Sequence, residues 1–235
     1  MKQLTEDIFL LEGLQGANSY LLTSGSELTL IDTGIPADAK AVQSEIKRAG
    51  YPLSQLNLII LTHGHGDHAG GAARLRESAP AEIAAHPEEI PYLRKKASLP
   101  FRSLLKKALF WLADQVLLPR PTLDGIQPVQ DGDRIEAAGG LEVIHTPGHT
   151  PGSTSYYQAE RGILFCGDAL FTRHPLTGRP GLQLPPHLVT VAPELAYQSA
   201  LQLAELDLNL LCPGHGAPLE ENPGSALDAL LKEKP

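Results

Sequence analysis

The chain has 235 residues, of which 42% are hydrophobic and 20% are charged, and its formal net charge is −8 at pH 7. This length and apolar content suit one folded domain over 1–235 and exclude a largely disordered chain. The acidic balance argues against nucleic acid and anionic lipid as partners, because their phosphates are negative too.

The chain is expected to be a cytoplasmic protein. Its first residues carry acids and no apolar segment follows them, so we expect no signal peptide. No apolar run approaches the roughly 18 residues of a membrane-spanning helix, so no stable membrane insertion is expected. Cys166 and Cys212 are too few for a disulfide framework and suit buried free thiols in a reducing compartment.

Short apolar or alternating runs predict strands in both halves of the chain. In the first half they cover 8–11, 19–23, 28–32, 56–61 and 83–85. In the second half they cover 133–135, 141–145, 153–157, 163–166 and 208–211. Helical spacing predicts helices over 37–49, 72–78, 193–206 and 226–232. In each half of the chain, several strands therefore come first, and a further strand followed by a helix comes after them.

Residues 88–121 differ from the rest and predict a helical insertion bracketed by prolines. A helix over 101–118 would place apolar residues on one stripe, namely Phe101, Leu104, Leu105, Ala108 and Leu112. The stripe has three interpretations: packing against the domain, a lid that gives a cleft an apolar wall, or a dimer surface. Neighbouring Lys and Arg residues favour contact with a lipid-like or anionic substrate.

Four ligand-type side chains follow strand 56–61 within six residues: His63, His65, Asp67 and His68. In a regular helix, the three histidines could not face one point. In a loop they can, because Gly64 and Gly66 take backbone angles that other residues resist. A polar turn with surface histidines is the alternative interpretation.

Three more candidate ligands follow the ends of predicted strands: His149, Asp168 and His215. Side chains at strand ends gather into sites in α/β sheets. Imidazoles combined with a few carboxylates are a ligand set that divalent metal ions prefer. The sequence therefore predicts a metal site built from five histidines and two aspartates.

These seven residues and Asp32 occur in the order found in the metallo-β-lactamase superfamily, which the chain resembles over nearly its whole length. The resemblance implies an α+β fold, a four-layer αββα sandwich, with the helical insertion at about 88–121. It also implies two divalent metal ions, with zinc expected and manganese or iron as alternatives. One ion would be held by His63, His65 and His149, the other by Asp67, His68 and His215, and Asp168 would bridge them.

Other polar residues near these positions are candidates for supporting roles. Asp32 would brace a ligand histidine, as the resemblance implies, or act as a turn residue. Thr62 and Thr150 either brace ligands or stabilise ordinary turns. His174 is a candidate pocket residue. The remaining histidines, His86, His145 and His187, are expected outside the ligand set.

Charge counting supports hydrolysis at such a site. Two divalent ions bring +4, two aspartates −2 and a bridging hydroxide −1, and the remaining +1 suits a developing oxyanion. Metal binding lowers the pKa of bound water from 15.7 to about 7. We expect a binuclear metal-dependent hydrolase whose bridging hydroxide attacks a carbonyl or phosphoryl centre, with catalytic Asp67 orienting the nucleophile and carrying its proton.

The expected substrate is a small ester, thioester or lactone. The stretch from Gly167 to Phe171 resembles glyoxalase II, but only 20 residues follow His215, too few for that family's glutathione-binding C-terminal domain. Phe171 stands where quorum-quenching lactonases carry a tyrosine. An iron-dependent oxidoreductase resembling persulfide dioxygenases and a non-catalytic metal-binding module are the alternatives, and a homodimer stays open.

Overall fold

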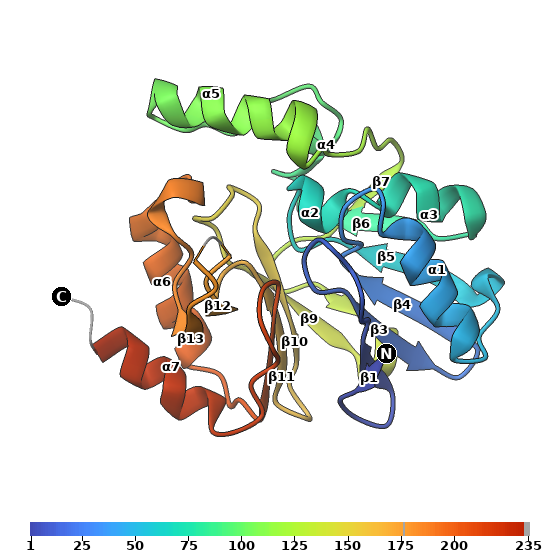
Figure 1. The fold of residues 1–235 in the computed structure, drawn as a ribbon. Coiled ribbons are helices and arrows are strands. Elements are labelled where there is room, and N and C mark those ends of the chain that lie inside the picture. Colours follow the sequence, from blue (N-terminus) through green and yellow to red (C-terminus); the bar gives the residue numbers. More distant parts are fainter. Residues whose placement is uncertain (176, 233–235) are drawn as a thin grey trace.

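Two β-sheets face each other in the computed structural model, which describes residues 1–175 and 177–232 (Figure 1). The first sheet has seven strands in sequence order: β1 (Lys2–Gln3), β2 (Ile8–Leu10), β3 (Tyr20–Ser24), β4 (Glu27–Ile31), β5 (Leu56–Ile60), β6 (Glu82–Ala85) and β7 (Ile126–Pro128). Strands β1 to β4 are antiparallel, and β4 to β7 are parallel. The carboxyl ends of β4, β5 and β6 therefore share one edge of this sheet.

The second sheet has five strands in the order β14-β11-β10-β9-β8. Their bounds are β8 (Arg134–Ile135), β9 (Leu141–His145), β10 (Thr154–Gln158), β11 (Ile163–Gly167) and β14 (Leu210–Pro213). Strands β11 and β14 are parallel and the other pairs are antiparallel. A separate two-stranded sheet joins β12 (Phe171–Arg173) to β13 (Pro180–Gln183).

Helices cover the outer face of each large sheet, as Figure 1 shows. Helices α1 (Ala39–Arg48) and α3 (Ala72–Ser78) pack on the first sheet through residues such as Val42 and Leu75. Helices α6 (Pro193–Ala204) and α7 (Pro223–Lys232) pack on the second through residues such as Leu203 and Leu227. The order of layers is therefore helix, sheet, sheet, helix, and the expected αββα sandwich is confirmed.

Alternation along the strands builds the core between the sheets. Ile31 and Ile60 of the first sheet belong to one buried cluster with Tyr156 and Phe165 of the second. The Tyr20 ring meets Phe165 edge-on, with centroids 5.3 Å apart. Because successive strand residues point to opposite faces, the other residues of these strands meet the helices instead.

The segment between β6 and β7 contains α4 (Ile90–Leu93), α5 (Leu104–Leu112) and one π-helical turn, η2 (Ala113–Leu117). Helix α5 begins after Ser103, whose Oγ accepts the Lys106 N–H. It lies outside the four layers, at the top of Figure 1. The chain also forms short 3₁₀ turns at η1 (Leu53–Gln55), η3 (Ala137–Gly139) and η4 (His187–Val189).

Most of the apolar stripe expected along residues 101–118 is not buried against the domain. Leu104 is 80% exposed and Leu105 is 70% exposed, and no residue of α5 is buried. Phe101 is buried, but it precedes the helix. The packing interpretation therefore does not hold for Leu104 and Leu105, whereas Phe110 packs against buried Phe101 with ring centroids 4.4 Å apart. Hydrophobic spacing predicts a face without saying what covers it.

Candidate metal centre

The first group of ligand-type atoms comes from three histidines. His63 follows β5, His65 directly precedes the short helix α2 (Gly66–Ala69), and His149 lies between β9 and β10. Nε2 of His63 and Nε2 of His149 each lie 3.0 Å from Nδ1 of His65. All three side chains are buried. Three nitrogens from two distant loops thus converge on one point.

The second group contains Asp67, His68 and His215. Asp67 and His68 lie in α2, while His215 follows β14. Nε2 of His215 lies 3.4 Å from Oδ2 of Asp67. The sequence predicted that all four ligand-type residues from His63 to His68 lie in a loop. This is wrong for the last two, because a helical turn begins at Gly66 and contains Asp67 and His68.

Asp168, directly after β11, lies between the two groups. Its Oδ2 is 3.3 Å from Nε2 of His149 and 3.6 Å from Nε2 of His215. Its Oδ1 is 3.2 Å from Nε2 of His68. One carboxylate thus faces nitrogens of both groups, and the sequence-predicted set of seven residues is brought together.

The spacing and hydrogen bonding of these atoms fit bound divalent cations. Two ligand atoms about 2.0–2.2 Å from a zinc ion at tetrahedral angles lie roughly 3.3–3.6 Å apart. The distances of 3.0–3.6 Å within the cluster are close to that separation. Nε2 of His68 and Oδ1 of Asp168 are buried, and apart from the 3.2 Å ion pair between them they have no hydrogen-bond partner among the described residues. Buried polar atoms normally have a partner, and a metal ion would supply one here.

Burial and charge distinguish the two groups. Burial lowers the pKa of His65 to about 3 and that of His149 to about 4, so both rings are neutral at pH 7, as metal ligation requires. Burial also lowers the pKa of His215, but Asp168 and Asp67 outweigh it and raise this pKa to about 9. Burial opposes ionisation of Asp168, yet His68 and His215 hold its pKa well below the usual value. In the metal-free site, protonated His215 therefore offsets the negative charge of these carboxylates, and a metal ion that binds there would displace its proton.

Asp32 braces His68, the first of the two roles considered for it. Its Oδ2 lies 2.7 Å from Nδ1 of His68 and accepts the Thr62 hydroxyl at 2.7 Å, while Oδ1 accepts the Thr62 N–H at 2.8 Å. The Asp32 carboxylate holds a proton of His68 at Nδ1, and Nε2 is directed at Asp168. Thr62 thus supports the site, and Thr150 bonds both Ser153 within its own turn and the Glu89 side chain.

Gly64 and Gly66 are required for a different reason from the one expected. Neither has a positive φ. A Cβ on Gly64 would lie 2.7 Å from the Tyr92 ring and 2.9 Å from Oε2 of Glu89. A Cβ on Gly66 would clash with the Leu118 carbonyl. Close packing of the segment that carries α4 and α5, rather than backbone freedom, therefore demands these two glycines.

Glu89 supports the site and was missed by sequence reasoning. Its side chain is buried, and the residue is 1% exposed. Oε2 accepts the Gly64 N–H and Oε1 accepts the Gly152 N–H, each at 2.8 Å. One carboxylate thus joins the loop of His63 and His65 to the loop of His149. In sequence Glu89 follows Glu88 in a polar turn, and nothing there distinguishes the buried acid from the exposed one.

The remaining candidates lie outside the ligand cluster. The rings of His86 and His145 stack with centroids 4.0 Å apart, and Nε2 of His145 lies 2.9 Å from the Pro151 carbonyl oxygen. His174 lies in the β12–β13 turn, where its Nδ1 accepts the Thr177 N–H. His187 begins η4. Cys166 and Cys212 are free buried thiols, as expected, and burial raises the pKa of both.

Two adjacent groups of His and Asp side chains at the edge of an αββα sandwich are the features of a metal-binding protein. The model of the metallo-beta-lactamase superfamily matches residues 13–215, and the chain belongs to this superfamily. Family membership and the paired His/Asp groups support a metal-dependent hydrolase in general. None of the helices in residues 1–175 and 177–232 has the length and apolarity needed to cross a membrane.

Curated proteins and solved structures include several relatives. YflN, a probable metallo-hydrolase of Bacillus subtilis (strain 168), is 32% identical over 218 residues, covering 88% of this chain and 83% of the relative. A hydroxyacylglutathione hydrolase of Pseudomonas aeruginosa (strain LESB58) is 34% identical over 138 residues, covering 58% of this chain and 41% of the relative. A metallo-beta-lactamase family protein of Thermus thermophilus matches with a TM-score of 0.72 and 25% identity, covering 98% of this chain and 80% of that protein.

Proposed function

We propose that the chain is a binuclear metal-dependent hydrolase that cleaves a small ester, thioester or lactone. The position of Asp168 is the observation that carries this proposal. Its oxygens lie 3.2–3.6 Å from nitrogens of both ligand groups, which suits a carboxylate shared by two cations. Zinc is the expected metal, with manganese or iron as alternatives. The proposal treats 1–235 as one domain with a helical insertion at about 88–121.

The chain's residues would divide the work as follows. His63, His65 and His149 would hold one ion and Asp67, His68 and His215 the other, with Asp168 between them. When bound, the ions would polarise the carbonyl oxygen and lower the pKa of water to about 7. Asp67 would orient the attacking water and accept its proton at a carboxylate oxygen.

Aromatic rings limit the access of bulk water to this site. The Phe171 ring packs 5.2 Å from the ring of His215, and the Phe110 ring packs 5.4 Å from that of His65. An apolar wall lowers the local dielectric constant and strengthens interactions with a developing oxyanion. The similarity to a hydroxyacylglutathione hydrolase supports an acyl compound as the substrate class.

Replacing Asp168 tests the proposal. We expect Asp168→Ala to lower kcat/KM for the best substrate of an ester, thioester and lactone panel by more than about 100-fold, because removal of only a supporting partner already costs 10–100-fold. Asp228→Ala, an exposed site on α7, is the matched control and should keep full activity. A folded Asp168→Ala protein with full activity would refute the shared carboxylate.

A further inference from the structure

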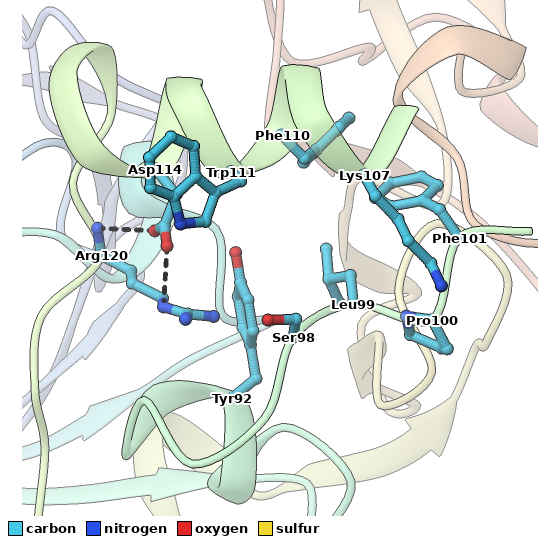
Figure 2. A pocket seen from close by; sticks show the side chains of 10 residues that line it. All are labelled: Tyr92, Ser98, Leu99, Pro100, Phe101, Lys107, Phe110, Trp111, Asp114 and Arg120. Atoms are coloured by element: carbon cyan, nitrogen blue, oxygen red, sulfur yellow. Dashed lines mark hydrogen bonds and ion pairs between the residues drawn. The ribbon is translucent and has the colours of Figure 1, made fainter. Parts of the chain in front are cut away.

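A cavity of about 330 Å³ lies between α5 with η2 and the segment 98–101 (Figure 2). Phe110 and Trp111 line it from the helix, and Tyr92 and Leu99 line it from the opposite side. This volume is at the small end of the range for small-molecule sites, about 300–1,000 Å³. The lining side chains suit an apolar hydrocarbon chain. One wall is formed by α5, the helix whose role the sequence left open.

The cavity adjoins the candidate metal centre. The Phe110 ring lies 5.4 Å from the His65 ring, and the Tyr92 ring lies 6.4 Å from it. The same two rings line the cavity, so the cavity lies beside a ligand histidine. An acyl substrate whose carbonyl lies at the metal centre could therefore place its chain in this cavity.

A buried arginine gives the cavity a specific polar group. Arg120 is 8% exposed, and its guanidinium carbon lies 3.8 Å from the centroid of the Tyr92 ring. Its Nε pairs with Oδ2 of Asp114 at 3.1 Å, whereas its Nη1 is buried and forms no hydrogen bond with the described residues. A buried guanidinium N–H without a partner is energetically unfavourable, and a planar carboxylate is its best complement.

The charges around the cavity agree with an anionic occupant. Lys107 is a second cation among the lining residues, and Asp114 is the only acid among them. Two cations against one carboxylate leave a net charge of +1 in a chain whose formal net charge is −8. This local positive charge favours a negative ligand against the repulsion of the rest of the molecule.

We propose that this cavity binds the acyl chain of a substrate that carries a free carboxylate, with the chain between Phe110 and Leu99 and the carboxylate on Arg120. The inference rests on the proposed function, because the acyl chain must belong to the hydrolysed ester or thioester. It narrows the substrate class to medium-length acyl compounds with an anionic group.

Trp111 offers a direct test, because it is the only tryptophan of the chain, lines the cavity and is 64% exposed. Its fluorescence in the protein as purified would be followed during titration with octanoate and with 1-octanol, which share one chain length. We expect saturable changes with octanoate and an affinity at least about 10-fold above that for 1-octanol. Equal affinities, or no change with either compound, would overturn the proposal.

Two variants locate the binding. Arg120→Gln should remove the preference for octanoate and leave 1-octanol binding unchanged, whereas Ser98→Phe should fill the cavity and weaken both. Arg134→Gln, at an exposed arginine of β8, is the matched control and should leave both titrations unchanged. A folded Arg120→Gln protein that still prefers octanoate would place the carboxylate elsewhere, for example on bound metal, and would overturn the proposal. If Arg120→Gln does not fold, the proposal is still tested by Ser98→Phe and by comparing the two compounds on the unaltered protein.

The same experiment separates the two levels of inference. Octanoate binding that depends on Arg120, in a protein that hydrolyses no member of the substrate panel, would support the carboxylate site and contradict the proposed function. Hydrolysis without octanoate binding would support the proposed function and show that the cavity does not bind the acyl chain.

Discussion

Glu89 and Asp32 are buried acids that lie outside both ligand groups yet contact the residues that carry them. Asp32 accepts hydrogen bonds from Thr62 and faces Nδ1 of His68. Glu89 accepts one backbone N–H from each of two ligand-bearing loops. Partners of this kind orient metal ligands, and their loss weakens metal binding by about 10–100-fold.

Glu89→Gln is expected to weaken metal binding by about 10–100-fold. Glutamine keeps one acceptor oxygen, but its NH₂ group would face a backbone N–H of Gly64 or Gly152. The affinity for Co²⁺ and the visible spectrum of bound Co²⁺ are the readouts, because the spectrum reports ligand geometry independently of turnover. Glu88→Gln, at the exposed neighbouring acid, is the matched control. An unchanged affinity and spectrum in Glu89→Gln would show that the carboxylate does not position the loops.

Residue type and strand-end position were enough to predict that the seven candidate residues lie together, but not the contacts of Glu89. His149, Asp168 and His215 follow buried strands, and parallel strands bring their carboxyl ends to one edge. Glu89 acts on backbone groups of distant loops, and a single sequence carries no signal for such a contact. The sequence also did not show why glycine is required at positions 64 and 66, because the reason is close packing against the segment that carries α4 and α5.

Helix α5 is the element that departs most from the expectation. Its leucines follow a helical stripe, yet Leu104 and Leu105 are largely exposed, and the residues that line the cavity are Lys107, Phe110 and Trp111. An exposed apolar helix beside a cavity is typical of binding elements rather than of core helices. The lid and dimer-surface interpretations of this helix both stay predictions.

The double change Leu104→Ser and Leu105→Ser should alter the free energy of unfolding by no more than about 0.5 kcal/mol for each residue, because neither side chain is buried. Leu75→Ala, in the buried face of α3, is the control for a packed helix and should cost about 2–5 kcal/mol. Chemical denaturation measures both. A loss of several kcal/mol from the two leucine changes would support the packing interpretation instead.

At the scale of the whole molecule, the apolar periods predicted the longer strands and the covering helices, whereas the αββα order was expected from the resemblance to the metallo-β-lactamase superfamily. The short strands β1 and β7 and the β12–β13 pair were not predicted. Each has only two to four residues, and β7 and β13 contain a proline. Their pairing depends on neighbours from other parts of the chain, which a local pattern does not contain.

Removing metal should destabilise the whole fold, because the cluster joins loops from both sheets. A ligand at 100 times its Kd contributes about 2.7 kcal/mol, which corresponds to a fall in Tm of about 5–10 °C for a chain of this size. Thermal unfolding with and without a chelator measures this, and Asp168→Ala should show a smaller difference. An identical Tm in both conditions would argue against metal bound in the folded state.

Elemental analysis of the freshly purified protein, in moles of each metal per chain, tests the central claim most directly. The two ligand groups that share Asp168 predict about two zinc or manganese ions per chain. About one iron per chain, especially with oxygen uptake in the presence of a persulfide, would contradict the binuclear hydrolase and indicate an oxidoreductase on the same fold.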